Sequence, residues 1–232
     1  MLFVVVVLIL AGGSGSRTGQ NIPKQFVEVK GKPIIIYTLE AFQKHSEIDS
    51  IIVVSISSWE QTVLDLSKKY KITKLLTVVQ GGETGQSSIF CGLKEIQKQC
   101  SEDDLIIIHE AVRPLVSHDV VTDSIRICKK YGGAVASLPS HDAMFLYSTD
   151  NTVSEQIPRD KLVKTQNPHT FPLRKLLWAH EEAAKRGITN SVGTSTLMVE
   201  LGESFHLSKG SEKNFKLTTY EDIEIFKALL DI

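Results

Sequence analysis

Short apolar runs alternate with stretches of helical periodicity along most of the chain. The apolar runs are rich in β-branched residues and lie at positions 4–10, 51–56, 75–79 and 105–108. Runs of this kind are typical of strands that are buried on both faces of a parallel sheet. Apolar residues recur at helical spacing over positions 33–42, 59–70, 87–96 and 120–131. Because strands that alternate with helices form βαβ units, the sequence predicts an α/β fold with a mostly parallel sheet.

The first apolar run ends in a glycine-rich loop that is followed by two cationic side chains. Gly12, Gly13 and Gly15 succeed the run, and Arg17 and Lys24 come after them. Glycines allow backbone amides to approach a polyphosphate closely, and a nest of such amides binds anions. The cations add positive charge that stabilises a transferring phosphoryl group. This stretch therefore predicts a nucleoside triphosphate site.

Other interpretations of the same stretch are a turn without a ligand, a dinucleotide site, a P-loop and a secretory signal. A dinucleotide fingerprint requires a third glycine where Thr18 stands, and the Gly-Lys-Ser/Thr of a P-loop is absent. No basic residue precedes the apolar run, and the run is much shorter than the roughly 20 residues of a membrane span. The turn without a ligand stays open, since glycine turns are common.

Two further polar clusters follow apolar runs. A second glycine loop spans 81–86, and Ser87-Ser88 is expected to cap and open the next helix. The run at 105–108 ends in a polar cluster from His109 to Pro114. Ligand crevices lie outside the carboxyl ends of parallel strands, so we expect the three clusters to meet at one edge. His109 ends a buried strand, and we predict a structural role for it rather than that of a general base.

The segment from about 139 to 165 differs from the rest of the chain. It is polar and contains short extended pieces around Asp150-Asn151, a favourable pair for a hairpin turn. We predict that it forms a β-arm that projects from the sheet. Helices are expected over 172–185, 194–201 and 220–230, with Thr219 as the cap of the last one. No repeat or convincing linker divides the chain, so residues 1–232 are expected to form a single domain.

Composition narrows the class of protein further. Hydrophobic residues make up 42% of the chain, enough for a large core, and the formal net charge is -1. A net charge this close to zero gives no general attraction to nucleic acids or acidic membranes, and we expect neither as a partner. The cysteines, Cys91, Cys100 and Cys128, lack metal-site spacing, and Cys91 and Cys128 are expected to pack as small apolar residues. This usage indicates a reducing compartment, and we expect a cytoplasmic protein.

Taken together, several segments resemble the cytidylyltransferases that activate polyol phosphates. In chain order, these segments are Leu10-Ala11-Gly12-Gly13-x-Gly15-x-Arg17, Pro23-Lys24-Gln25-Phe26, Gly31-Lys32-Pro33, Gly81-Gly82 with Ser88 and Gly92-Leu93, Ile108-His109-x-Ala111-Val112-Arg113-Pro114, Gln166-x-Pro168-x-x-Phe171, and Lys216-x-Thr218-Thr219-x-Glu221-Asp222. They cover essentially the whole chain. The two best-known branches of the family make CDP-methylerythritol for isoprenoids and CDP-ribitol for wall or capsule polymers.

The resemblance implies a Rossmann-like nucleotidyltransferase domain that uses CTP and Mg²⁺ and releases pyrophosphate. It also implies a homodimer in which the arm of one subunit reaches the site of the other. It assigns nucleotide binding to Leu10, Ala11, Gly12, Gly13, Gly15, Gly82 and Ser88. It assigns catalytic contacts to Arg17, Lys24, Lys216 and Arg159 of the partner subunit, and acceptor contacts to Glu110, Arg113 and Asn167. It assigns no side chain to the metal.

Three positions depart from the usual pattern of that family, and all lie on the acceptor side. Glu110 stands where most relatives carry Asp, Ala143 replaces the Thr of an Asp-Thr pair, and Asn167 interrupts a Gln-Thr-Pro motif. The second glycine loop and the segment 195–198 are closer to the ribitol branch than to the methylerythritol branch. We therefore expect CMP transfer from CTP to D-ribitol 5-phosphate. The alternatives are methylerythritol 4-phosphate as the acceptor, and a CTP-binding protein without turnover.

Overall fold

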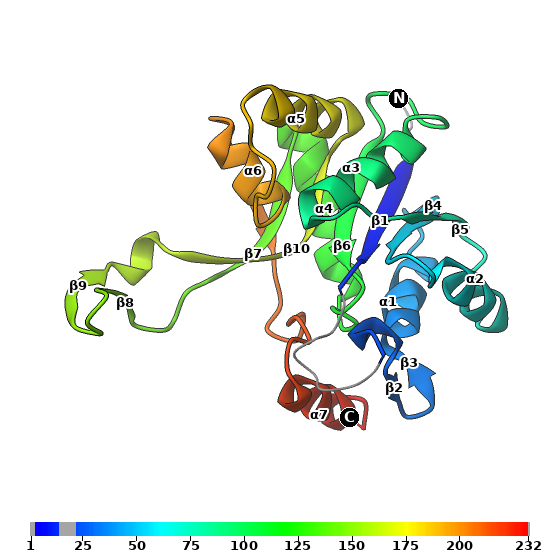
Figure 1. The fold of residues 1–232 in the computed structure, drawn as a ribbon, viewed down its shortest axis with the longest axis horizontal. Helices are drawn as coiled ribbons and strands as arrows, with labels where there is room; N and C mark the ends of the chain where they lie inside the picture. The colour runs from blue at the N-terminus through cyan, green and yellow to red at the C-terminus, as the bar shows by residue number, and fades with distance from the viewer. Residues whose placement is uncertain (1–2, 14–21, 232) are drawn as a thin grey trace.

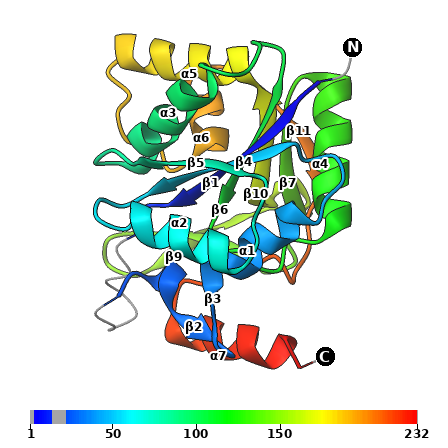
Figure 2. The same ribbon diagram turned by 90° about the vertical axis from the view of Figure 1, so that its right-hand side faces the viewer.

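The computed structural model describes residues 3–13 and 22–231, and these form three layers with a sheet in the middle (Figures 1 and 2). The strands of this sheet are β1 (Val5–Ala11), β4 (Ser50–Ser55), β5 (Leu75–Gln80), β6 (Leu105–Glu110), β7 (Ala134–Pro139), β10 (Val163–Pro172) and β11 (His206–Lys209). Their spatial order is β11-β7-β10-β6-β1-β4-β5. Neighbouring strands are parallel except at β10, which runs antiparallel to β6 and β7. The prediction of an α/β fold with a mostly parallel sheet is confirmed.

Helices cover both faces of the sheet. They are α1 (Ile34–Gln43), α2 (Glu60–Lys69), α3 (Gly85–Ile96), α4 (His118–Tyr131), α5 (Leu173–Lys185), α6 (Thr194–Glu200) and α7 (Tyr220–Leu229). Two small hairpins complete the fold, β2 (Glu28–Val29) with β3 (Lys32–Pro33) and β8 (Met144–Tyr147) with β9 (Val153–Ile157). The short 3-10 turns are η2 (Lys24–Phe26) and η3 (Arg159–Lys161).

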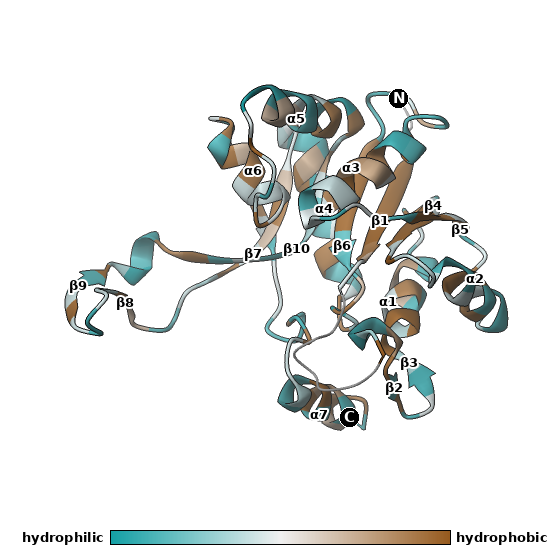
Figure 3. Ribbon diagram, in the orientation of Figure 1, coloured by the Kyte–Doolittle hydropathy of each residue, from teal (hydrophilic) through white to brown (hydrophobic). Residues whose placement is uncertain are grey.

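The continuous apolar sequence of β1 reflects burial on both faces. Val5, Val7 and Ile9 pack into the core formed with α1, α2 and α4. Val6 and Leu8 point the other way, into the core formed with α3, α5 and α6. Successive side chains of a strand alternate between the two faces of the sheet. Every side chain of a strand covered on both faces is therefore buried, so apolar residues occupy successive positions. The central strands accordingly form the most hydrophobic part of the ribbon in Figure 3.

Strand β10 was not predicted from the sequence. Its first three residues are exposed and its last seven are buried, and its register on β7 shifts between Thr165 and His169. Polar residues and two prolines within the strand hide the usual β signal. Pairing with β6 and β7 on both sides supplies the stabilisation that the residue types do not predict. A second expectation was also wrong, because Cys128 is buried but Cys91 is exposed on α3.

The segment between β7 and β10 projects from the body of the molecule as an arm (Figure 1). The hairpin β8–β9 forms its tip, and Asn151 adopts a positive φ of 61° in the turn, which asparagine tolerates. Apolar side chains of the arm are open to solvent, with Phe145 50% and Tyr147 73% exposed. The arm therefore leaves apolar surface unburied within one chain.

A third, smaller core lies at the carboxyl edge of the sheet and anchors the end of the chain. Val27, Ile34, Leu217 and Phe226 are among its buried members. Thr219 caps α7 in a reciprocal capping box with Asp222, as the sequence predicted. Within residues 3–13 and 22–231, no helix is long and apolar enough to cross a membrane.

Gly92 provides a test of the packing between α3 and the sheet. A Cβ at this position would lie 2.4 Å from Leu8 Cδ1 and 2.8 Å from Val54 Cγ2. Overpacking costs about 1–3 kcal/mol, whereas alanine gains about 1 kcal/mol of helix propensity. We expect Gly92→Ala to lower the free energy of unfolding in urea by up to about 2 kcal/mol, the difference between these two effects. Gly85→Ala is the matched control, because no atom lies within 4 Å of its Cβ position. Equal stabilities of the two variants would contradict this packing.

Candidate active site

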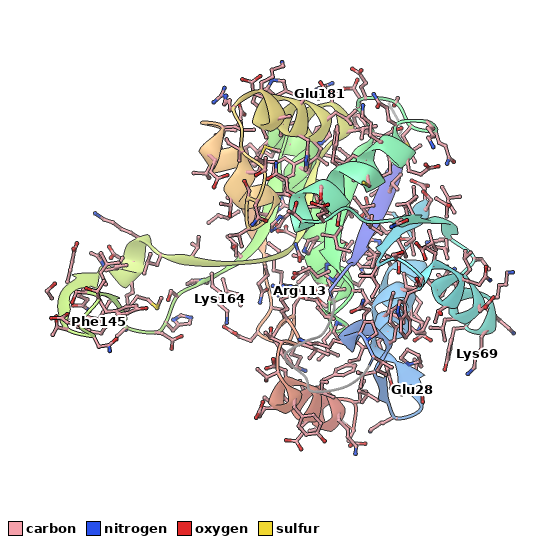
Figure 4. All side chains as sticks on the ribbon, in the orientation of Figure 1. Glu28, Lys69, Arg113, Phe145, Lys164 and Glu181 are labelled. Carbon is pink, nitrogen blue, oxygen red and sulfur yellow. The ribbon has the colours of Figure 1, made fainter. Side chains whose placement is uncertain are left out.

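A cleft of about 650 Å³ opens at the carboxyl edge of the sheet, where β1, β5 and β6 end. Arg113 lies at this edge in Figure 4. The lining includes most of the residues predicted from the sequence, namely Leu10, Gly12, Gly13, Lys24, Gly82, Ser88, Glu110, Arg113, Asn167 and Lys216. The expectation that the polar clusters converge on one edge is therefore confirmed.

The strand order explains why the cleft lies there. β4 and β5 follow on one side of β1, whereas β6 pairs with the other side. The connecting helices also change faces, since α1 and α2 pack in one core and α3 in the other. The loops after β1 and β6 therefore separate and leave a crevice between them. Open α/β sheets bind their ligands at such a switch point.

The first glycine loop begins at the wall of the cleft. Leu10, Gly12 and Gly13 line it directly after β1. Ala11 is only 1% exposed, and its carbonyl accepts a hydrogen bond of 2.6 Å from Gln25 Nε2. Ala11 is thus absent from the described lining, and it ties the start of the loop to η2. Gly15 and Arg17 lie outside the described residues.

The second glycine loop is held against the first turn of α3. Thr84 is the N-cap of this helix, which begins at Gly85, and it forms a capping box with Ser87. The expectation that Ser87-Ser88 caps and opens the helix is therefore wrong. Ser88 instead fixes Gly82, whose amide donates to Ser88 Oγ over 3.1 Å. A Cβ on Gly82 would lie 2.4 Å from Ser87 Oγ, so the loop has no room for a side chain there.

Lys24 connects the first loop with the C-terminal segment. Its side chain is buried, and Nζ donates to the carbonyl of Thr218 over 2.5 Å. The amide of Leu217 donates to the carbonyl of Val112 over 2.9 Å, which binds the same segment to the turn after β6. These contacts bring Lys24 and Lys216 to one cleft although they are far apart in the chain.

Glu110 binds two cations. Its Oε2 accepts from Arg113 Nε over 2.8 Å, and its Oε1 accepts from Lys216 Nζ over 2.5 Å. Burial raises the pKa of Glu110, but Lys216 and Arg113 outweigh it and hold the pKa below its usual value. The carboxylate is therefore ionised at neutral pH. The predicted acceptor residues Glu110 and Arg113 thus form one ion-pair network with the predicted catalytic Lys216.

Asn214, which was not among the residues predicted from the sequence, stabilises this network. Its side chain is fully buried, and Nδ2 donates to the carbonyl of Asn167 over 2.5 Å. Its own carbonyl accepts from Arg113 Nη1 over 2.9 Å. Asn214 therefore ties β10 to the Arg113 guanidinium. Its position close to the motif that begins at Lys216 indicated that it lies near the site. Its residue type alone did not distinguish it from other asparagines in loops.

Other residues of the lining were also missed, among them Gln25, Glu83, Thr84, Gln166, His169, Thr194 and Ser195. Gln25 and Gln166 stand in motifs that the sequence analysis used, so they could have been selected. The Gln166 amide exchanges two hydrogen bonds with the backbone of Ser211, of 3.0 and 3.1 Å. Burial lowers the pKa of His169 to about 4, so this ring is neutral at pH 7.

Arg159 does not line this cleft. It begins η3 on the arm and borders a separate hollow of about 440 Å³ at the base of the arm. Figure 4 shows the arm, marked by Lys164 and Phe145, extending away from Arg113. Within the described part of one chain, the structure does not bring Arg159 to the predicted site residues that line the cleft.

His109 supports the turn after β6 from inside the core. Its ring is 0% exposed, packs edge-on against Phe42, and donates from Nε2 to the carbonyl of Arg113 over 3.1 Å. Burial lowers the pKa of His109 to about 3, which keeps the ring neutral at pH 7. A ring with no exposed surface does not reach a substrate, which agrees with the structural role predicted for it.

The sheet, its glycine loops and the cationic cleft at its carboxyl edge define a Rossmann-like nucleotidyltransferase. The family model described as IspD, 2-C-methyl-D-erythritol 4-phosphate cytidylyltransferase, matches residues 5–231. The chain belongs to this family and is a CTP-dependent nucleotidyltransferase.

Relatives in both acceptor branches align over nearly the full chain. A ribitol-5-phosphate cytidylyltransferase of Lacticaseibacillus paracasei is 40% identical over 229 residues, which are 98% of each chain. A 2-C-methyl-D-erythritol 4-phosphate cytidylyltransferase of Clostridium botulinum is 33% identical over 97% of this chain and 96% of that relative. The crystal structure of 4-diphosphocytidyl-2C-methyl-D-erythritol synthase from Anaerococcus prevotii has a TM-score of 0.85 at 25% identity and covers both chains completely.

The buried histidine predicts a loss of stability in acid. The unfolded chain protonates His109 near pH 6.5, whereas the folded chain excludes the proton until about pH 3. The stability from this group is therefore complete above pH 6.5 and is lost as the pH falls toward 3. We expect His109→Gln to reduce the difference in unfolding free energy between pH 7.5 and 5.5 by about 1 kcal/mol.

Urea unfolding of wild type and variant at both pH values measures this effect. His180 is a matched comparison outside the cleft, because burial lowers its pKa to about 4. We expect His180→Gln to reduce the pH dependence of the unfolding free energy by a similar amount. An unchanged pH dependence in His109→Gln would show that the ring is not excluded from protonation.

Proposed function

We propose that this chain transfers CMP from CTP to D-ribitol 5-phosphate and releases CDP-ribitol and pyrophosphate. The observation that carries the proposal is the convergence of Lys24, Arg113 and Lys216 on the cleft that the two glycine loops line. The relative from Lacticaseibacillus paracasei supports ribitol 5-phosphate as the acceptor. We further propose that the reaction takes place in the cytoplasm, a reducing compartment compatible with the three free cysteines.

The reaction depends on positioning and on stabilisation of negative charge. A phosphate monoester is an anion at neutral pH, so its oxygen attacks the α-phosphorus of CTP without a general base. The bond from the α-phosphorus to its bridging oxygen breaks, and pyrophosphate leaves. In this scheme the amides of the first glycine loop and the Gly82–Ser88 pair hold CTP, and Lys24 stabilises charge on its phosphates. Arg17 is expected to share that role.

The acceptor takes the opposite end of the cleft in this scheme. The planar Arg113 guanidinium and the Lys216 ammonium suit an acceptor phosphate. Glu110 and Asn167 line the same region and offer hydrogen-bonding groups to polyol hydroxyls. Arg113 is held by both Glu110 and the Asn214 carbonyl, so it binds in a fixed orientation.

Mg²⁺ is proposed as the cofactor. Within the described ranges, no group of three or more His, Cys, Asp or Glu side chains is arranged to hold a metal ion. The lining does provide two carboxylates, Glu83 and Glu110. This fits an ion that is held mainly by substrate phosphates and water, with one or two carboxylates from the protein. Such an ion neutralises charge on the phosphates when it is bound.

A second candidate acceptor is 2-C-methyl-D-erythritol 4-phosphate. The name of the family model and the 33% identical relative from Clostridium botulinum favour it. The same cleft and the same cations would serve this reaction, because only the polyol part differs.

The active unit is proposed to be a homodimer in which each arm completes the site of the partner. Exposed Phe145 and Tyr147 on the arm, together with Leu207 beside its base, supply unburied apolar surface for such an interface. The position of Arg159 on this arm supports a role in the second subunit's site, since it lies away from the cleft of its own chain.

The acceptor is tested by pyrophosphate release with CTP and Mg²⁺, measured with ribitol 5-phosphate and with methylerythritol 4-phosphate. We expect turnover with ribitol 5-phosphate. Lys24→Met should lower kcat by roughly 10²- to 10³-fold, because it removes a positioned charge donor of similar length. A thermal melt of the variant controls for folding. Turnover with methylerythritol 4-phosphate alone would select the second candidate, and none with either would leave a CTP-binding protein.

A mixing experiment tests the exchange of arms. Arg159→Ala and Lys24→Met are each expected to be nearly inactive. If Arg159 acts in the partner's site, a mixed dimer regains one intact site, and an equal mixture recovers about a quarter of wild-type activity by random pairing. Lys24→Met mixed with Lys216→Met is the control, since both changes fall in the same chain's cleft and restore no site. Failure of the first mixture to recover activity in a confirmed mixed dimer would place Arg159 elsewhere.

A further inference from the structure

The two cations assigned above to the acceptor phosphate already share an anion. Both oxygens of Glu110 are occupied, one by Arg113 and one by Lys216. An incoming phosphate therefore does not meet two available charges. It must first compete with a carboxylate of this chain.

We propose that Glu110 is a resident counter-anion that sets the specificity of the acceptor subsite, by excluding simple phosphate and admitting a phosphate that carries hydroxyl groups. The proposal rests on the proposed function, because that function places the acceptor phosphate on Arg113 and Lys216. Glu110, predicted from the sequence to contact the acceptor, thereby gains a role in selecting it.

The two cations differ in how easily they leave Glu110. The Arg113 side chain is 13% exposed, and its guanidinium is also held by the Asn214 carbonyl over 2.9 Å. The Lys216 side chain is 44% exposed and ends in a single ammonium on a flexible stem. Lys216 is therefore the cation that moves to an arriving phosphate, while Arg113 stays on Glu110 Oε2 and binds the phosphate with its remaining N–H groups.

Movement of Lys216 leaves Glu110 Oε1 without its donor. The Glu110 side chain is only 23% exposed, so water replaces that donor incompletely. A partly buried carboxylate that loses a charged partner costs free energy. Inorganic phosphate brings no carbon-bound hydroxyl to that oxygen, whereas a polyol phosphate can donate one. The exchange therefore favours polyol phosphates over the simple phosphate and pyrophosphate anions that accompany the reaction.

The length of the glutamate side chain matters for this arrangement. Arg113 lies three residues after Glu110, but Lys216 comes from a segment 106 positions away. An aspartate, which is shorter by one methylene, would retain contact with the neighbouring Arg113 and withdraw from Lys216. We therefore expect Glu110→Asp to weaken the exclusion of phosphate only in part.

Calorimetric titration tests the proposal without turnover. The protein is saturated with Mg²⁺ and α,β-methylene CTP, whose α–β linkage does not break in the reaction, and is titrated with inorganic phosphate or with ribitol 5-phosphate. We expect Glu110→Gln to bind inorganic phosphate about tenfold more tightly than wild type, because an ion-pair competitor is gone. Its preference for ribitol 5-phosphate over phosphate should fall by the same factor or more. Glu110→Asp should lie between the two.

Glu102→Gln is the matched control. It removes one negative charge from an exposed position just before β6, at the opposite edge of the sheet, and should bind both ligands as wild type does. A thermal melt checks that each variant is folded. Unchanged phosphate affinity in both folded Glu110 variants would overturn the proposal. If Glu110→Gln binds phosphate more tightly but no variant binds ribitol 5-phosphate, the role of Glu110 as a counter-anion stands and ribitol 5-phosphate is rejected as the acceptor. The failure of this proposal and the failure of the proposed function are therefore distinguishable.

Discussion

The parallel pairing of β1 with β6 is the constraint on which the site depends. Its register sets Leu10 opposite Glu110, so the start of the first glycine loop lies beside the carboxylate that binds Arg113 and Lys216. Both strands are buried on two faces, and a shift of one residue would exchange every side chain between the two cores. The burial of apolar side chains in the two cores therefore fixes which part of the first glycine loop faces Glu110.

A second constraint is the segment that precedes α7, which closes the cleft last in chain order. Three backbone contacts hold it, from Lys24 to the Thr218 carbonyl, from Leu217 to the Val112 carbonyl, and from Arg113 to the Asn214 carbonyl. The partners come from the first loop and from the turn after β6, so the segment is positioned by both halves of the site. The small core around Phe226 then anchors it to α1 and the β2–β3 hairpin. The part of the cleft lined by Lys216, Leu217 and Thr218 is complete only when the end of the chain is packed.

The sequence was informative about elements that local residue types determine. It was uninformative about elements that depend on contacts with residues far away in the chain. The buried strands, the amphipathic helices and the Thr219 cap were predictable, because periodicity and capping are local signals. β10 was not, since its polar residues gain their stability from β6 and β7. Three hydroxyl residues between Thr84 and Ser88 compete to cap α3, and backbone geometry decides among them. The role of Asn214 depends on Asn167 and Arg113, which lie far away in the chain. The role proposed for Arg159 depends on a second chain.

The two ends of the cleft are built on different physical principles. The proposed nucleotide end relies on backbone amides and on a second glycine loop where close contacts at Gly81 and Gly82 leave no room for side chains, so its chemistry does not vary easily with sequence. The proposed acceptor end relies on side chains that neutralise one another before any substrate arrives. Without Glu110, the Arg113 and Lys216 charges would repel, and the segment that carries Lys216 would lose a contact that holds it in place. The carboxylate that competes with phosphate therefore also keeps the acceptor end ordered. In a site built in this way, substitution of a few side chains can change the acceptor while the nucleotide end stays constant. This accounts for a family whose branches share CTP and differ in the polyol.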